Sequence, residues 1–492
     1  MPGYYAGFLL LVPLVGIIAC LSNLFYNVYL HPLRSCAGPK LWAASRLPWC
    51  WYQHRGMLQY KLLELHKKYG HAVRIAPNEL SFTTETAWRT IYGQRSAEMS
   101  KDPIFSLLTP TGVQNIMVAD RETHNRQRRL LSHAFSEKAL REQESLIQMH
   151  ISKLIEQLES RSPSGNVDLV SWLNFLTFDL VGDMCFGENF GCLDKGEYDP
   201  FVRAIQGMAT ELTYTQMYKY WHLDGLRRYV VSKKSVGKRM ENVKRAMMAV
   251  GRRMQRETTR KDFMHYIMAA NDEKGMSPQE IHVNALSLNI AGSESSATAL
   301  CGIIFLLLTN PACYNRLVEE IRGAYDSEED ITILKSHDLS YMDAVISESL
   351  RLYPPVAITM PRRTPVGGET IDDISVPADM TVGVHHYSTY RHPDNFHQPE
   401  QFLPERWLAA MRTSPPFQND RRECVQPFSF GPRNCLGKNL ARAEIRLTLS
   451  RLLWRFDVRL QSGQMNWLKS QRLQGFWQKP PLLCTLTQVK RT

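Results

Sequence analysis

The stretch Phe428–Leu447, FSFGPRNCLGKNLARAEIRL, places a single cysteine, Cys435, between a Gly-Pro turn and a run of helix-forming residues. Gly431 and Pro432 allow a tight turn, and Gly437 allows a second close approach of the backbone to something flat or bulky. The apolar spacing after Cys435 predicts a helix, so we expect the sulfur at a helix N-terminus, where it would have a lowered pKa. The residues alone leave three interpretations open: a nucleophile, a metal ligand and a buried structural cysteine.

Two long helical segments precede this stretch. Ser277, Pro278 and Glu280 form a helix-start signal, and Asn310-Pro311 forms a stop, so residues 278–309 predict a central helix. At ~1.5 Å per residue this helix is long enough to cross a whole domain. Its apolar pattern is interrupted at Ala291–Ser296 (AGSESS), where Glu294 requires a partner, a polar pocket or water if it is buried.

The second segment, residues 338–355, carries a possible ion pair. Glu348 and Arg351 are three residues apart and share a helix face among apolar neighbours. We expect this pair to be half-buried and to require a further partner, which Arg406 could provide. An exposed pair would contribute almost nothing to stability.

Bulk composition narrows the class of protein. The chain has 492 residues and ten scattered cysteines without a CxxC spacing, which argues against a zinc site and indicates reduced thiols. The formal net charge of +11 is not concentrated in a dense basic run or a nucleic-acid-binding motif, so we expect no nucleic-acid partner. An acidic protein or anionic lipid is the alternative partner for this charge.

The N-terminal segment has the composition of a membrane anchor. Residues 1–33 contain no Asp, Glu, Lys or Arg, and Tyr4–Leu21 is long and apolar enough to cross a bilayer as a helix. A cleaved signal peptide is the alternative, but it normally begins with a positive region that is missing here. Basic residues follow the span, which places the rest of the chain in the cytoplasm. We therefore expect an anchor and hinge at 1–33 and a catalytic domain at 34–492.

Several motifs together resemble one known family. Phe428-x-x-Gly431-x-Arg433-x-Cys435-x-Gly437 is similar to the heme-binding signature of the cytochrome P450 family. Three further blocks match in order: the central AGSESS segment, the Glu-x-x-Arg pair, and Pro404–Trp407, which contains Arg406. The resemblance covers essentially the whole chain, and residues 26–48 resemble the entry segment of membrane-bound members from filamentous fungi.

This resemblance implies a mainly α fold with small β-sheets (α+β), a long central helix and an N-terminal transmembrane helix. It implies heme b as cofactor, with the Cys435 thiolate as the axial iron ligand. The residues that it assigns to the heme site are Phe428, Gly431, Arg433, Gly437, His124, Arg128 and Arg362. His124 stands where the family usually has Trp, and neighbouring Arg363 makes the register of Arg362 ambiguous.

The resemblance also assigns proton relay beside bound dioxygen to Glu294 and Ser295. Ser295 departs from the usual threonine, keeping the hydroxyl but losing the methyl group that restricts its rotamer. Electrons would come from NADPH through NADPH–cytochrome P450 reductase at the endoplasmic reticulum membrane. The basic residues Arg433, Lys438, Arg442 and Arg446 would suit an acidic docking partner.

The implied reaction is hydroxylation or another oxidation of a lipophilic small molecule, with a fungal terpenoid or polyketide as the expected substrate. Family topology would line the pocket with residues 103–118, 205–225, 288–291, 356–358 and 471–476. Two alternatives remain: a heme-thiolate isomerase, dehydratase or coupling oxidase, and a non-catalytic heme sensor or scaffold. The sequence leaves the substrate, the oxidised position and the oligomeric state undetermined.

Overall fold

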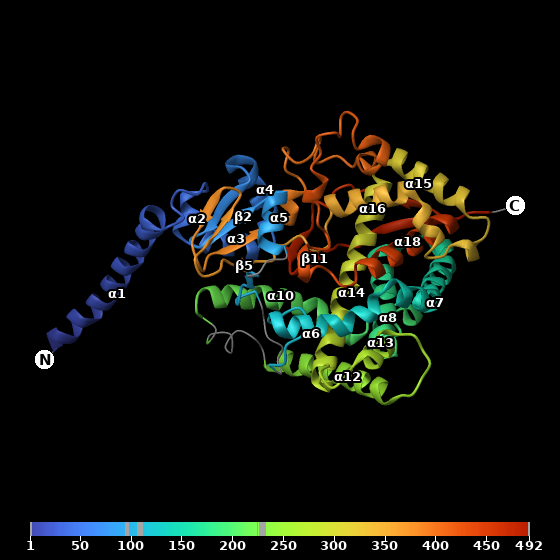
Figure 1. Ribbon diagram of the computed structural model, residues 1–492, viewed down its shortest axis with the longest axis horizontal. Coiled ribbons are helices and arrows are strands. Elements are labelled where there is room, and N and C mark those ends of the chain that lie inside the picture. The colour runs from blue at the N-terminus through green and yellow to red at the C-terminus, as the bar shows by residue number, and fades with distance from the viewer. Residues whose placement is uncertain (1, 94–97, 106–111, 224, 226–232, 491–492) are drawn as a thin grey trace.

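The computed structural model describes residues 2–93, 98–105, 112–223, 225 and 233–490. It confirms the predicted class, because a large helical body carries small sheets at its edges (Figure 1). The helices are α1 (Pro2–Phe25), α2 (Lys40–Ala44), α3 (Leu47–His54), α4 (Leu58–Tyr69), α5 (Glu85–Tyr92), α6 (Arg121–Leu131), α7 (Glu137–Arg161), α8 (Leu169–Phe186), α9 (Cys192–Lys195), α10 (Pro200–Tyr220), α12 (Lys233–Gln255), α13 (Phe263–Ala270), α14 (Pro278–Leu308), α15 (Pro311–Ala324), α16 (Ser340–Leu352), α17 (His386–Thr389) and α18 (Lys438–Arg455).

The largest sheet joins parts of the chain that are far apart in sequence. Its order is β1-β2-β8-β5-β3, with β1 at Ala72–Ala76, β2 at Glu79–Phe82, β8 at Thr381–Val384, β5 at Arg362–Arg363 and β3 at Ser100–Lys101. A second sheet has the order β4-β12-β9 (Asn166–Asp168, Leu483–Gln488, Phe456–Leu460), and β10 (Arg472–Gln474) pairs with β11 (Phe476–Gln478). The first sheet therefore positions Lys101 and Arg362 on adjacent strands.

A β-hairpin follows α16 in the chain. Strands β6 (Glu369–Ile371) and β7 (Ile374–Val376) pair antiparallel around Asp372 and Asp373. Both aspartates have positive φ, 47° and 62°, as a two-residue type I′ hairpin turn requires.

Helix α14 runs through the middle of the helical body (Figure 1). Its start has the predicted capping box, in which the Ser277 side chain and Glu280 satisfy each other's backbone N–H groups. Its close packing against α8 explains Gly292, because a Cβ at that position would lie 3.2 Å from Val181. The Ser293 hydroxyl also donates to the Thr177 carbonyl of α8 at 3.2 Å. The central helix is therefore fixed on the α8 side.

Helix α1 projects away from the body at its N-terminal end (Figure 1). It continues into a π-helical turn at Tyr26–Leu30, and Pro13–Leu30 is long and apolar enough to cross a membrane. This window is only 6% buried, whereas the other two helices with such a composition, α8 and α14, are 94% and 78% buried in the protein. The N-terminal helix thus has the exposed apolar surface expected of a membrane anchor.

Candidate active site

The loop that carries Cys435 is closed by backbone hydrogen bonds. The Cys435 N–H donates to the Phe428 carbonyl at 2.8 Å, and the Asn434 N–H donates to the Gly431 carbonyl at 3.1 Å. Gly431 has φ +73°, and a Cβ there would lie 1.9 Å from the Tyr92 carbonyl oxygen. Glycine is therefore required at this turn, both for its left-handed backbone and for the approach of α5.

The structure corrects two expectations about Cys435. Helix α18 begins at Lys438 with Gly437 as its N-cap, so the cysteine lies in the preceding loop and not in the first turn. The pKa of its thiol is raised, because burial outweighs the opposing effects of the Gly437 N–H and Arg128. The apolar pattern of the stretch predicted the helix but not its first residue, because Leu436 and Gly437 are compatible with either conformation.

Cys435 faces the interior and still has accessible surface. The residue has solvent-accessible surface, yet burial by the surrounding protein is the main cause that raises the pKa of its thiol. Both observations fit a sulfur at the wall of an internal space. Gly437 borders the same loop with a normal φ of −83°, and a Cβ there would meet only Phe135, at 3.8 Å.

Four cationic side chains and one histidine gather beside this loop. Arg433 pairs with Glu98 and donates to the Ala119 carbonyl at 2.9 Å. Arg128, from α6, donates to the Asn434 side chain and to the Asn434 carbonyl. The remaining members are His124 from α6, Lys101 from β3 and Arg362 from β5, which the structure places near Arg433.

Crowding of like charges changes the proton affinities of this group. Burial, followed by repulsion from Arg433 and Arg362, lowers the pKa of Lys101 to about 7. Burial and then Arg433 lower the pKa of His124 to about 4, so its imidazole is neutral at pH 7. Burial also lowers the pKa of Arg362 and of Arg128. These side chains form a cationic site with more positive charge than Glu98 can balance.

The ambiguity between Arg362 and Arg363 is resolved by strand alternation. Arg362 is buried and lies over the Tyr92 ring, with 5.2 Å from its Cζ to the ring centroid. Arg363 points the other way and pairs with Asp102 at 3.0 Å and Asp379 at 3.3 Å. Arg362 is therefore the member of the cationic site, and Arg363 is not.

These residues fit the heme that the resemblance implies. An accessible interior thiol would provide a sulfur ligand of the kind that heme iron takes from cysteine. Excess buried cations match the two propionate groups of heme b, because guanidinium groups bind carboxylates strongly in such surroundings. Cys435 would hold the iron, and Arg128, Arg362, Arg433 and Lys101 would bind the propionates.

One face of α14 also borders an open interior space. Ala291 is exposed and Ser295, one turn later, is half-buried, although its neighbours Glu294 and Ser296 are buried. The Ser295 hydroxyl donates to the Ala291 carbonyl at 2.6 Å. Serine lacks the methyl group with which threonine restricts its rotamer. Here the hydrogen bond to Ala291 restricts the serine rotamer instead.

Glu294 lies on a different face of α14 from Ser295 and is almost fully buried. Its carboxylate pairs with Lys479, which follows β11, and Lys479 also donates to the Thr298 hydroxyl at 2.7 Å. The Glu294 side chain is 5% exposed and that of Lys479 is 4% exposed. The other carboxylate oxygen, Oε2, has no hydrogen-bond partner among the described residues. The required partner of Glu294 is therefore a lysine from the C-terminal part of the chain.

The expected ion pair of α16 is more buried than the sequence suggested. Glu348, Arg351 and Arg406 all have side chains that are 0% exposed. Arg351 forms two bonds to Glu348, at 2.8 and 2.9 Å, while Arg406 approaches from the opposite segment at 3.1 Å. Trp407 donates to the same carboxylate at 2.8 Å. Because neither carboxylate oxygen is free, we assign this triad a structural role.

A second buried carboxyl group connects α18 to α14. Glu444 is 1% exposed, and burial raises its pKa to about 8 against an opposing hydrogen bond with Ser296. The group is thus protonated in the folded protein at pH 7, whereas it is charged in the unfolded chain.

We predict that Glu444→Gln removes a pH-dependent loss of stability. Between pH 6 and pH 8 the folded protein keeps the Glu444 proton and the unfolded chain does not, so wild-type stability falls as pH rises. Because the amide does not titrate, the free energy of unfolding of the variant should fall by about 2 kcal/mol less than that of the wild type between pH 6 and pH 8. Urea unfolding at both pH values measures this difference. The control is exposed Glu319→Gln, which should follow the wild type. Parallel curves for wild type and Glu444→Gln would contradict a protonated Glu444.

The prediction of a basic docking surface near Cys435 is wrong in part. Arg446 is buried and bound to Asp343 at 2.8 and 2.9 Å, and Arg433 belongs to the interior cationic site. Arg442 is half-buried with its Cζ 5.8 Å from the centroid of the Phe428 ring. Of these four residues only Lys438 is exposed. Their spacing along the sequence could not show which face of α18 packs inward.

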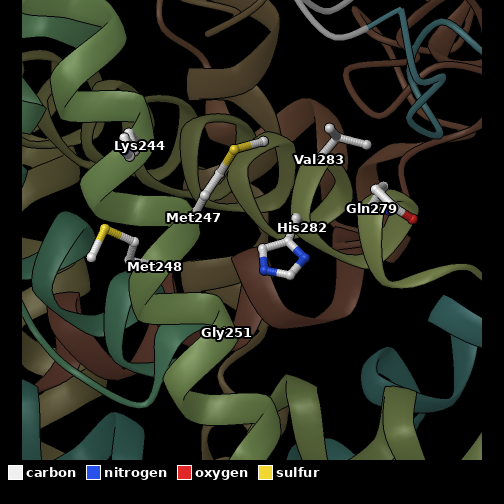
Figure 2. Close-up of a pocket in the computed structure, with 7 residues that line it drawn as sticks. All are labelled: Lys244, Met247, Met248, Gly251, Gln279, His282 and Val283. Carbon is white, nitrogen blue, oxygen red and sulfur yellow. The ribbon is translucent and has the colours of Figure 1, made fainter.

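The predicted substrate-lining segments are described in part. Residues 106–111 and 224 lie outside the described residues. A separate pocket of about 420 Å³ lies between α12 and the first turns of α14, lined by Lys244, Met247, Met248, Gly251, Gln279, His282 and Val283 (Figure 2). Its lining includes neither Cys435 nor a member of the cationic site, so this pocket is separate from the cysteine loop.

Sequence reasoning missed Lys101, Glu98, Asn434 and Lys479. Lys101 and Lys479 lie next to or in short strands, where no helical spacing links them to the motifs. The only available signal was chemical: a buried Glu294 requires a cation, and Lys479 is a cation in an apolar segment. Nothing in the sequence specified which lysine would be the partner.

Comparison with known proteins supports the resemblance. Residues 38–485 match the family model described as Cytochrome P450. The chain is 43% identical over 468 residues to cytochrome P450 monooxygenase astJ of Aspergillus oryzae, covering 94% of this chain and 93% of that protein. It is 40% identical to averantin hydroxylase of Dothistroma septosporum, with 97% and 91% coverage. It is 39% identical to trichothecene C-4 hydroxylase of Trichoderma arundinaceum, with 94% coverage of both chains. The chain thus belongs to the cytochrome P450 family, as a monooxygenase related to fungal enzymes of secondary metabolism.

Proposed function

We propose that this enzyme hydroxylates a lipophilic secondary metabolite, with a terpenoid or polyketide as the expected scaffold. The reaction would use dioxygen and electrons from NADPH, delivered by NADPH–cytochrome P450 reductase. The observation that carries the proposal is the accessible thiol of Cys435, which faces the interior beside a cluster of unbalanced cations. The hydroxylases among the relatives support the same type of reaction.

The chain's contribution at the heme site is to hold the sulfur and orient the cofactor. The Gly431 turn directs Cys435, and the N–H of Gly437 hydrogen-bonds to its sulfur. The cationic site would fix the carboxylate edge of the macrocycle. When bound, heme supplies dioxygen activation, which a thiolate ligand favours by donating electron density.

Proton delivery is the role that we propose for the middle of α14. The Glu294 carboxylate is held between Lys479 and Thr298, and none of the described residues hydrogen-bonds to its second oxygen. Ser295 has its hydroxyl on the face that borders the open interior. In this relay the Glu294 carboxylate would first take up a proton from solvent. The neutral carboxyl group would then rotate away from Lys479 and release the proton on the Ser295 side.

The location that we propose is the endoplasmic reticulum membrane. The apolar segment Pro13–Leu30 would cross the bilayer once, and residues 34–492 would form the cytosolic catalytic domain. Exposed Lys438 suits an acidic reductase surface, although its three predicted neighbours on the face do not. Neutralising Lys438 alone should therefore affect docking only modestly.

One contact favours a second candidate, a heme-thiolate enzyme that rearranges or couples its substrate without inserting oxygen. The Ser295 hydroxyl proton already binds the Ala291 carbonyl at 2.6 Å, which leaves it less available for delivery to dioxygen. This alternative predicts a product without an atom from molecular oxygen.

The deciding experiment screens lipophilic compounds for the spin-state shift that marks displacement of water from the iron. Hits are then incubated with reductase, NADPH and oxygen-18 gas. Our proposal expects one labelled oxygen atom in the product for each NADPH consumed. Turnover of a binding compound to an unlabelled product would instead establish the rearranging or coupling enzyme.

We predict that Glu294→Gln slows turnover on the order of 100-fold, because amide cannot act as a proton donor and acceptor of the carboxyl type. The spectrum of the reduced carbon-monoxide complex should stay intact, since Glu294 pairs with Lys479 and does not contact the Cys435 loop. Rates of product formation and hydrogen peroxide release measure the effect. The control is Glu319→Gln, at an exposed position on α15. Unchanged turnover and peroxide release in Glu294→Gln would remove this carboxylate from the relay.

A further inference from the structure

A second group of metal-ligand side chains lies apart from the cysteine loop. His71 immediately precedes β1, and His392 and Asp394 lie in the segment after α17. One ligand atom from each side chain lies within 4.8 Å of the others. Among the described residues this is the one such group of three, and it contains no cysteine. The absence of a CxxC spacing therefore gives no argument against it.

The Thr83 hydroxyl contacts His71 at two points. Its oxygen lies 2.8 Å from the ring Nδ1 and 3.4 Å from the His71 carbonyl oxygen. When the hydroxyl donates to that carbonyl, its oxygen accepts from Nδ1–H, and this is the tautomer that a metal site requires. The remaining nitrogen, Nε2, then carries a lone pair, because the neutral ring has only one N–H. Nε2 lies 3.4 Å from the Asp394 carboxylate, which is also an acceptor.

His392 has the same arrangement with its nitrogens exchanged. Its Nε2–H donates to the His66 carbonyl at 3.4 Å, which leaves the Nδ1 lone pair facing the Asp394 carboxylate at 3.6 Å. The backbone N–H of Asp394 donates to this lone pair at 3.2 Å, so a bound cation would replace that hydrogen bond. One nitrogen of each imidazole and one oxygen of the carboxylate thus lie within 4.8 Å of one another, and the two ring centroids are 4.3 Å apart at an interplanar angle of 33°.

We propose that His71 Nε2, His392 Nδ1 and the Asp394 carboxylate form a site for a divalent transition-metal ion of the zinc type. Two ligands of a tetrahedral zinc ion, at ~2.0–2.1 Å from the metal, lie roughly 3.4 Å apart. The two nitrogen–oxygen distances here are 3.4 and 3.6 Å. Imidazole and carboxylate together favour zinc and its neighbours over magnesium or calcium.

The surroundings preorganise this group. Thr83 and the His66 carbonyl orient the two rings by their outer nitrogens, as partners of metal-bound histidines commonly do. Asn395 connects the two segments by donating to the Thr83 and Thr389 carbonyls, each at 2.9 Å. Asp394 is 62% exposed, so the fourth coordination position opens to solvent. A bound ion would therefore connect the start of β1 with the segment after α17.

Equilibrium dialysis against zinc tests the site on the full-length, heme-loaded protein in detergent after treatment with a chelator. Metal content is measured by mass spectrometry. The variants are His71→Gln and Asp394→Asn, of which the second changes an exposed side chain and should leave folding intact. The matched control is His337→Gln, which removes an exposed histidine that also neighbours an aspartate.

We expect wild type and His337→Gln to bind one zinc ion per chain more tightly than His71→Gln and Asp394→Asn, by at least about tenfold. Zinc should also raise the temperature of heme loss in wild type and leave that of Asp394→Asn unchanged. Equal zinc affinity in wild type and both site variants, with intact heme spectra, would show that the three side chains form only an imidazole–carboxylate ion pair.

Discussion

Cys435→Ser should abolish both the thiolate-type spectrum and the activity. A serine hydroxyl is a far weaker ligand than a thiolate, and no other cysteine in the described chain occupies an accessible interior loop with adjacent excess cations. We therefore expect the purified variant to lack the reduced carbon-monoxide band that marks a thiolate-bound heme. Product formation should fall to the level without enzyme, because activation of dioxygen depends on that ligand.

The spectrum distinguishes loss of the ligand from loss of the fold. The matched control is Cys313→Ser, at a half-buried cysteine on α15, which should keep the band and most of the activity. Circular dichroism should show helical content near wild type in both variants, since the Gly431 turn and the Phe428 carbonyl bond use the backbone at residue 435. If Cys435→Ser retains the thiolate band, another residue holds the iron.

Local rules predicted the elements that depend on local chemistry. Ser277, Pro278 and Glu280 determine the start of α14 through hydrogen bonds within one turn, so the capping box was visible in the sequence. The Asp372-Asp373 turn is similarly local. The motif around Cys435 lies in a loop, and the helix after it begins three residues later than the apolar pattern suggested.

Contacts between distant segments explain what the sequence could not show. Lys479 meets Glu294 across 185 positions, and Lys101 joins Arg362 through the pairing of β3 with β5. Such encounters depend on sheet topology and on which helix face packs inward, and neither follows from spacing along one element. The same reason explains Arg446, which looked like a surface cation and binds Asp343 in the interior.

The second large effect is expected from Glu348→Gln, at the centre of the buried triad. The amide has nearly the shape of the carboxylate but no charge, so Arg351 and Arg406 lose the anion between them. Burial opposes ionisation of Glu348, yet the two arginines outweigh it and lower its pKa, which shows that the charged form is the stable one. Breaking a buried pair from one side typically costs ~3–5 kcal/mol of folding stability.

Other contacts reduce this loss without removing it. Arg351 keeps three carbonyl acceptors, those of Tyr390, Pro399 and Gln401, and Arg406 keeps Asp420. The stability that Glu348→Gln loses therefore comes mainly from charge pairing in a site that water does not reach. A marginally stable fold has about 5–15 kcal/mol in total, so we expect most of the variant to lose heme during purification or at mild temperature.

A pair with the same spacing on the surface provides the control. Lys61 and Glu64 are also three residues apart, at 2.6 Å, but the Glu64 side chain is 65% exposed. Glu64→Gln should change the urea midpoint and the half-life of heme retention by less than the equivalent of about 0.5 kcal/mol. If Glu348→Gln were as stable as Glu64→Gln, burial of the triad would contribute nothing, and the segment Pro404–Trp407 that carries Arg406 would have to be held to α16 by its apolar contacts alone.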